Sequence, residues 1–417
     1  MLSKYKLNQL YFKDTQFANL MTRRIFNVLL IANPYDAFML EDDGRIDEKI
    51  FNEYASLSLR YPPRFSQVST EEEALSQLEN MSFDLVICMP GTGDNDSFDI
   101  GRHIKEKYEH IPIVILTPFS HGITKRISHE DLSAFEYVFC WLGNTDLLMS
   151  IIKLMEDKMN LEHDVQEVGV QLILLVEDGI RFYSSILPNL YKFVLKQSQE
   201  FSTEALNAHQ RTLRMRGRPK IVLARTYQEA MEIYQKYQNN IFGVITDVRF
   251  PRVEKGDKNS KKMDVDLRRI VSDNFGFGDF VFRNPETGEE IARVRNLKEL
   301  QNILFAVPAE SFLYHISRNH ISRWLYSRAM FPVAEFLKPI TWSSLQDVDA
   351  HRRIIFEAIV KYRKMKNQGV VAVFKRDRFD RYSNFARIGE GSLGGKGRGL
   401  AFIDNMVKRH PEFEEFE

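Results

Sequence analysis

The sequence predicts an α/β protein with two doubly wound, parallel-sheet domains, followed by a small, mainly helical module. Two observations predict this class. Short apolar runs alternate with amphipathic stretches from residue 26 to about residue 157, and the same alternation restarts at about residue 170. Parallel strands need long crossover connections, usually helices, so this alternation favours parallel sheets. The length of 417 residues also exceeds what one core supports and fits about three domains.

The first module spans residues 26–160 and follows an N-terminal extension at residues 1–25. Residues 144–159 repeat apolar positions at helical spacing, and the acidic, polar tail up to Gln166 indicates a link to the next module. Five apolar runs in the module have the length and composition of buried strands. These runs are residues 27–32, 65–69, 83–89, 111–117 and 137–141.

The second module spans residues 168–274 and repeats this order at similar spacing. Its fourth and fifth strands are missing, because the chain turns polar and lysine-rich at 255–262 and then has one more amphipathic stretch at 264–274. Either the module has lost these strands or a segment after Gly256 is absent. The basic run at 211–220 is expected to be a solvated loop. The predicted strands are 170–176, 220–224 and 241–246, with helices at 181–200 and 228–237.

The remaining chain divides into three predicted segments. Residues 275–345 form a mainly helical module, 346–385 a helix and strand linker, and 386–417 the start of a nucleotide-binding domain. Asparagine, proline and glycine at 284–288 predict a hairpin turn. The predicted helices are 297–306, 309–330 and 347–366, the last closed by Gly369 before a strand at 370–374.

Composition excludes several classes of protein. Lysine and arginine together number 57, as do aspartate and glutamate, so net charge gives no reason to expect nucleic acid or an acidic membrane as a partner. No run is long and apolar enough to span a bilayer, and the N-terminus has no apolar signal core. Cys88 and Cys140, the two cysteines, lie in predicted strands, which fits a reducing compartment. We therefore expect a cytoplasmic protein.

Three carboxylates mark the second module. Glu177 and Asp178 follow its first strand directly, and Asp247 follows its third. The carboxyl ends of neighbouring parallel strands face one crevice, so these side chains are expected to converge there. Three carboxylates can hold Mg²⁺, and the metal lets one of them attack a phosphoryl group. The plainer alternative is that acidic residues simply favour polar strand ends.

At these residues the second module resembles a response-regulator receiver domain, with Pro251 four residues after Asp247. The resemblance implies that Glu177, Asp178 and Asp247 bind Mg²⁺, that Asp247 accepts a phosphoryl group, and that a sensor histidine kinase is a partner. Receivers also use a hydroxyl after the fourth strand and a lysine after the fifth. Lys258 resembles that lysine but lies only eleven residues after Asp247, so the switch is expected to be crippled.

The first module resembles a receiver whose chemistry has been replaced. Asn33-Pro34 stands at the acidic pair, with Asp36 a little further on, and Met89 stands at the acceptor position. Trp141 occupies the lysine position, and Thr117 remains at the hydroxyl position. Methionine cannot accept a phosphoryl group through a carboxylate. We therefore expect a degenerate receiver kept as an interaction surface, through which a homodimer could form.

A glycine-rich segment at 389–400 surrounds one lysine. Glycine lets backbone amides approach an anion closely, and the lysine adds a point charge. Residues 394–401, Gly-Gly-Lys-Gly-Arg-Gly-Leu-Ala, resemble the opening of the ATP-grasp-like domain of phosphoenolpyruvate synthase and pyruvate phosphate dikinase. The resemblance implies that Gly394, Gly395, Lys396 and Gly397 contact ATP phosphates. A flexible glycine linker is the alternative, and both a P-loop and a dinucleotide fold fit poorly.

The whole layout resembles the N-terminal region of a phosphoenolpyruvate synthase-like phosphotransferase, whose complete form uses ATP to phosphorylate pyruvate. On that interpretation the chain is a regulatory fragment that lacks activity by itself and works with downstream catalytic domains, so its status as an enzyme stays open. One alternative is a Mg²⁺-dependent phosphoacceptor response regulator acting through protein–protein contacts. Another is a non-catalytic scaffold.

Overall fold

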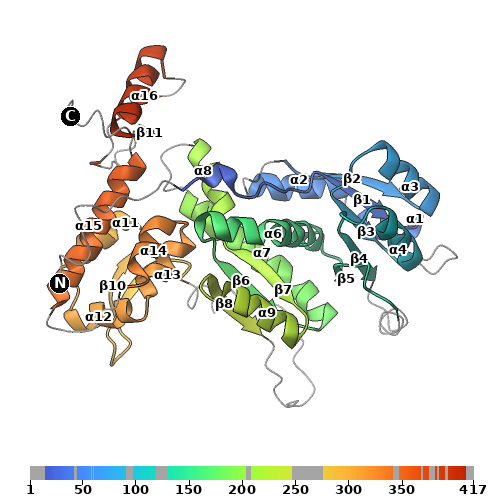
Figure 1. The fold of residues 1–417 in the computed structure, drawn as a ribbon, viewed down its shortest axis with the longest axis horizontal. Coiled ribbons are helices and arrows are strands. Elements are labelled where there is room, and N and C mark those ends of the chain that lie inside the picture. The colour runs from blue at the N-terminus through green and yellow to red at the C-terminus, as the bar shows by residue number, and fades with distance from the viewer. Residues whose placement is uncertain are drawn as a thin grey trace.

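A computed structural model describes most of the chain, with gaps. The described residues are 15–41, 45–57, 59, 61–90, 97–118, 130–202, 208–246, 276–340, 347–367, 370–374, 381–382, 385–389 and 393–409. Within these ranges the modules follow one another along the long axis of the molecule (Figure 1). No helix of the described ranges has both the length and the apolar character needed to cross a bilayer.

The first module is a five-stranded parallel sheet in the order β2-β1-β3-β4-β5, the doubly wound order of flavodoxin-like folds. Its α/β class and five strands agree with the sequence prediction. The strands are β1 (Asn27–Ile31), β2 (Arg64–Val68), β3 (Leu85–Cys88), β4 (Ile113–Pro118) and β5 (Tyr137–Trp141). The helices between them are α1 (Pro34–Glu41), α2 (Ile46–Ser56), α3 (Glu71–Asn80) and α4 (Ser97–Lys107).

Both faces of this sheet are covered, which explains why its central strands read as continuous apolar runs. Val28 and Leu30 of β1 face one hydrophobic cluster, whereas Leu29 and Ile31 face another. Successive side chains of a strand point to opposite faces, so a strand buried on both sides needs apolar residues throughout. The edge strand β2 is more exposed, and its sequence, Arg-Phe-Ser-Gln-Val, is correspondingly more polar.

The second module has a three-stranded parallel sheet in the order β7-β6-β8 within the described residues. Its strands are β6 (Leu172–Val176), β7 (Lys220–Ala224) and β8 (Ile241–Thr246), with helices α7 (Ile180–Ser202) and α9 (Tyr227–Tyr237). Val176 is level with both Ala224 and Thr246, so the three strands end side by side. The predicted stretches at 255–262 and 264–274 lie outside the described residues.

Two sequence predictions about polar segments are wrong, and they are wrong for the same reason. The expected link up to Gln166 belongs to α6 (Asp146–Val168), one helix of 23 residues that ends at Gly169 with a left-handed φ of 73°. The expected solvated loop at 211–220 comprises α8 (Ala208–Arg214), a 3₁₀ turn η4 (Met215–Gly217) and the start of β7. Acidic residues of the helix and basic residues of the second segment pair with each other in the interior.

Asp157 and Asp164 of α6 are the buried acids of these pairs. Asp157 accepts two bonds from the Arg218 guanidinium, at 2.7 and 2.9 Å, and further bonds from the Tyr191 hydroxyl and the Ile221 amide. Asp164 lies 2.7 Å from the Lys220 ammonium, and both side chains are fully buried. Hydrophobic patterning treats such residues as surface, because it sees one segment at a time and not the partner.

The N-terminal segment runs along the same polar face of α6. The amides of Met21, Arg23 and Ile25 donate to Asp164, Asn160 and Glu156, respectively, at 3.2, 2.9 and 3.3 Å. Four helical residues rise about 6 Å, and two extended residues span about 6.6 Å, so alternate amides match successive turns. The N-terminal segment, which the sequence predicts to be an extension, is therefore attached to α6. It includes the 3₁₀ turn η3 (Phe17–Asn19).

The third module combines a hairpin with short helices. The hairpin β9 (Phe280–Arg283) and β10 (Glu290–Val294) forms at the predicted turn. The predicted helix 309–330 is broken instead into α12 (Ala309–Ser317) and α13 (His320–Ser327), because Asn319 has a left-handed φ of 57°. The remaining elements are α11 (Leu297–Ile303), α14 (Phe331–Leu337), α15 (Val348–Asn367), the parallel pair β11 (Val371–Val373) and β12 (Phe385–Arg387), and α16 (Gly395–Arg409).

One hydrophobic cluster runs through all three modules. It includes Leu30 of the first sheet, Ile151 of α6, Leu175 of the second sheet, Trp324 of α13 and Ile359 of α15. The second sheet thus gains much of its core from its neighbours and depends on them for burial.

Candidate functional site

The candidate site lies where the second sheet ends. Glu177 follows β6 directly, its amide donates to the Ala224 carbonyl at 3.0 Å, and its side chain is buried. Asp178, the next residue, is exposed. β8 ends at Thr246, level with Val176, and Asp247 is the following residue of the chain but lies outside the described residues.

Local geometry fixes the Glu177 carboxylate in this loop. The Gly179 amide donates to its Oε1 at 2.9 Å. A Cβ at Gly179 would lie 2.8 Å from that oxygen, so a side chain there would displace it. The glycine therefore lets the loop close tightly on the carboxylate and lead into α7.

The loop also connects the site to the first module. Helix α7 begins at Ile180 and contacts the edge strand β5. The Tyr183 hydroxyl donates to the Val138 carbonyl, and the Ser184 hydroxyl accepts from the Cys140 amide at 2.9 Å. These bonds satisfy backbone groups of β5 that an open edge would leave to solvent. Only the first residues of α7 therefore separate the Glu177 loop from the first sheet, so a conformational change in the loop would act on β5 through them.

The corresponding edge of the first sheet holds different chemistry. Met89 follows β3 and is buried, with its amide donating to the Ile31 carbonyl at 2.8 Å. Asp36 accepts from the Asn33 amide group at 2.7 Å. Burial raises the pKa of Asp36 above its usual range, and the Asn33 bond partly opposes that shift. Of the residues that the sequence singles out at this edge, Asp36 is the one carboxylate.

The sequence predicts three metal ligands, Glu177, Asp178 and Asp247, and the structure describes the first two. Among the described residues, no group of three or more histidine, cysteine, aspartate or glutamate side chains is placed to hold a metal ion. Glu177 and Asp178 supply carboxylate oxygens of the kind that Mg²⁺ prefers, and Asp247 would complete the set.

The glycine-rich segment forms the beginning of α16. Gly394 precedes the helix, and Gly395, Lys396 and Gly397 make up its first turn, with Lys396 exposed. A Cβ at Gly394 or Gly395 would meet no atom within 4 Å, so packing inside the described chain gives no reason for glycine there. The arrangement places a helix N-terminus beside the exposed side chains of Lys396 and Arg398.

An apolar side of α16 is exposed. Leu400, Phe402, Ile403 and Met406 are each more than 40% accessible, and α16 stands away from the helical module in Figure 1. Apolar residues gathered in this way on one short helix usually contact another structure.

Two histidines of the third module are explained by packing. His315 accepts from the Arg283 amide through Nε2 at 3.0 Å, so its Nδ1 carries the proton and donates to His320 Nδ1 at 3.0 Å. Burial, with the nearby His320, lowers the pKa of His315 to about 4. The pair is therefore neutral at pH 7, with His315 Nε2 and the facing Nδ1 atoms engaged in hydrogen bonds.

Comparison with known proteins yields structural neighbours only. No protein-family model matches the chain, and no curated protein matches it either. A response regulator protein, TrrA from Thermotoga maritima, solved with Mg²⁺-BeF, is 19% identical over 31% of this chain and 99% of its own, with a TM-score of 0.23. A signal receiver domain of a putative LuxO repressor from Vibrio parahaemolyticus is 16% identical over 34% and 98%, with a TM-score of 0.24.

A longer match is NtrX from Brucella abortus, solved with ATP, at 9% identity over 81% of this chain and 80% of its own, with a TM-score of 0.27. The neighbours named here are thus a response regulator protein, a signal receiver domain and NtrX. At these identities and scores they add no argument about activity, and the fold assignment rests on the strand order of the sheets.

Proposed function

We propose that the second module is a Mg²⁺-dependent phosphoacceptor that acts through contacts with neighbouring protein modules. Asp247 would be the acceptor, and Glu177, Asp178 and Asp247 would hold the cation. One carboxylate oxygen of Asp247 attacks the phosphorus of the donor, and the bond from phosphorus to the leaving group breaks. Mg²⁺ offsets the repulsion between the carboxylates and the phosphoryl oxygens.

The observation that carries this proposal is the level ending of three parallel strands with two carboxylates directly after the middle one. Asp247 is bonded to Thr246, the residue paired with Val176 one position before Glu177.

The bonds from α7 to β5 support the output side of the proposal. The loop that carries Glu177 continues within a few residues into Tyr183 and Ser184, which bind the first sheet. The first module would then be the receiving surface, consistent with Met89 at its acceptor position. A sensor histidine kinase is the proposed phosphodonor, and a homodimer through the receiver-like modules is a further possible contact. The switch residues after the fourth and fifth strands have no candidates among the described residues.

Labelling with acetyl phosphate tests the acceptor directly. Intact-mass measurement should show one added phosphoryl group in the presence of Mg²⁺ and none with EDTA. Asp247→Asn should abolish it, and Glu177→Gln should slow it about tenfold or more, as expected for loss of a metal-holding group.

Asp36→Asn in the first module is the matched control and should label like the parent protein. Labelling that persists in Asp247→Asn, or that proceeds without a divalent cation, would sink the acceptor assignment.

The exposed start of α16 favours a second candidate function, ATP-phosphate binding in a phosphoenolpyruvate synthase-like protein. Gly394, Gly395, Lys396 and Gly397 would form one strip of that site, and the exposed apolar side of α16 would contact the rest of the ATP-binding domain. ATP binding by this chain that is unchanged in Lys396→Ala would contradict it.

A further inference from the structure

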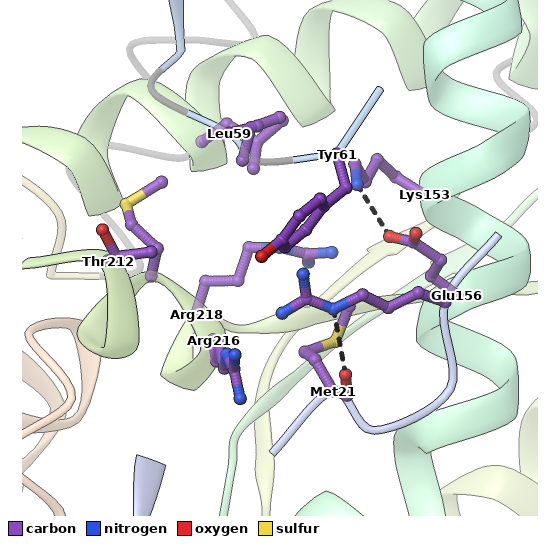
Figure 2. Close-up of a pocket in the computed structure, with 11 residues that line it drawn as sticks. Met21, Leu59, Tyr61, Lys153, Glu156, Thr212, Arg216 and Arg218 are labelled. Carbon is purple, nitrogen blue, oxygen red and sulfur yellow. Dashed lines mark hydrogen bonds and ion pairs between the residues drawn. The ribbon is translucent and has the colours of Figure 1, made fainter. Parts of the chain in front are cut away.

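A cavity of about 60 Å³ lies where the first two modules meet the N-terminal segment. Its walls come from segments far apart in the sequence: the N-terminal segment, the chain after α2, and α6, α7, α8 and η4. In Figure 2 the labelled side chains surround one space, with the Lys153–Glu156 pair of α6 on one side and Thr212 of α8 on the opposite side.

The lining of this junction cavity is strongly cationic. Four of its side chains carry positive charge and one carries negative charge: Arg24, Lys153, Arg216 and Arg218, against Glu156. Asp157 lies behind Arg218 and adds a second carboxylate. Four cations against these two carboxylates leave an excess of two positive charges, which a bound anion would offset.

Two of the cations are held in place before any ligand arrives. Arg218 forms its two-pronged contact with Asp157, and Lys153 lies 2.7 Å from Glu156. Both cationic side chains are less than 10% exposed. A site whose groups are fixed in advance loses little conformational entropy when it binds.

Hydroxyl groups and an opening complete the cavity. Thr212 contributes a hydroxyl to the wall, and Tyr61 lines the cavity while remaining 59% exposed, which places the opening beside its ring. Met21 and Tyr61 have left-handed φ values of 53° and 61°, two of four such non-glycine residues in the described part of the chain. Backbone strain of this kind often accompanies ligand sites.

The volume fits a compact anion. A water molecule needs about 10–15 Å³ on this measure, so the cavity has room for about four waters. Guanidinium forks, an ammonium and hydroxyls are the groups that proteins use for phosphate oxygens. A carboxylate ligand would use the same donors less fully, because it has two oxygens where phosphate has three or four.

We propose that the junction cavity binds a phosphate dianion. The ligand is either the free ion or the phosphoryl group of a small phosphomonoester whose organic part extends out of the cavity past Tyr61. Because the lining comes from both modules, bound phosphate would also strengthen their contact. The proposal is independent of Asp247 chemistry, which needs Mg²⁺ and a phosphodonor.

Isothermal calorimetry on the full chain in EDTA, without a phosphodonor, tests this site. Inorganic phosphate should bind with saturable heat, whereas chloride at equal ionic strength should not. Arg24→Gln should weaken phosphate binding about tenfold, the usual effect of losing one charge-assisted hydrogen bond. Arg23→Gln, which changes the exposed neighbouring arginine outside the cavity, should bind like the parent.

Phenyl phosphate distinguishes the two sources of the ligand. Tighter binding than inorganic phosphate assigns the site to phosphomonoesters, and weaker binding assigns it to the free ion; both outcomes support the shared chemistry. Thr212→Val gives a second lining variant that keeps all charges. The proposal is overturned if the parent shows no saturable phosphate heat, or if Arg24→Gln and Arg23→Gln, both folded by circular dichroism, bind phosphate equally.

Discussion

The sheets of the first two modules differ both in how their cores are built and in which residues follow their carboxyl ends. The first sheet has five strands, its own cluster on one face and a methionine at the position where a carboxylate would act. The second has three described strands, shares its main core with its neighbours and carries Glu177 and Asp178 at its edge. The module with the five-stranded sheet is therefore not the module that carries the candidate site.

Because of this difference, we expect substitutions to lower the free energy of unfolding most where the second module joins the first. Its contacts with α6 include ion pairs whose side chains are buried from bulk solvent. The most severe variants are consequently expected at the junction and the mildest at the edge of the first sheet.

Asp157→Ala should have the largest effect on stability. Removing this carboxylate leaves the buried Arg218 guanidinium without its counter-charge, and breaking such a pair costs about 3–5 kcal/mol. Asp157 is also the group that holds the pKa of Arg218 above its usual range against the effect of burial. Urea denaturation followed by circular dichroism measures the loss in free energy of unfolding.

Two further variants separate charge burial from packing. Glu79→Ala removes an exposed pair with Lys107 in the first module and should change the free energy of unfolding far less than Asp157→Ala. Asp157→Leu combined with Arg218→Met replaces both charges and should recover part of the loss, because the buried Tyr191 hydroxyl and Ile221 amide still lose their acceptor. A single Asp157→Ala variant as stable as Glu79→Ala would show that the junction is not the critical region.

Tyr183→Phe should have an intermediate effect. The change keeps the ring, which packs edge-on against Phe139 at 5.7 Å, and removes the hydroxyl that donates to the Val138 carbonyl. Leaving that carbonyl unsatisfied should cost about 1–3 kcal/mol in free energy of unfolding. Tyr227→Phe, at a tyrosine that is 76% exposed, is the control and should change stability by less than about 0.5 kcal/mol. Equal losses in both variants would contradict the assigned bond.

Asp36→Asn should have the smallest effect, and it should be stabilising at neutral pH. The folded-state pKa of Asp36 is raised, chiefly by burial, so its favourable contribution is present below the unfolded pKa and lost as pH rises through the folded value. Asparagine carries no charge, so it removes the cost of burying the ionised carboxylate, and its side-chain oxygen can still accept from Asn33. With allowance for solvent screening, the gain should be small at pH 7 and should vanish below the unfolded-state pKa of about 4.

Parallel unfolding measurements at pH 7 and below pH 4 check the sign. A loss at pH 7 would show that the carboxylate of Asp36 contributes favourable contacts that burial does not cancel. Asp47→Asn, at an exposed acid of the same module, should give no such gain.

The sequence predicted the strands well because each strand is defined by its own apolar residues. The strands at 137–141, 220–224 and 241–246 have the predicted bounds. It failed where two polar segments supply each other's counter-charges, as Asp157 and Arg218 do, because a pairing 61 residues apart leaves no local pattern. The receiver-like carboxylates were predicted from strand ends, and the position of Asp247 in that set stays a prediction.

Helix α6, which joins the first two modules, also sets the order in which parts of the chain can fold during synthesis. Asp157 leaves the ribosome 61 residues before Arg218, a delay of about 3–12 s at ordinary elongation rates. Throughout that interval the first sheet can close over the apolar side of α6, while the carboxylates on its other side stay hydrated. The nascent first module would therefore present a charged surface until its basic partners emerge, which disfavours premature association between chains.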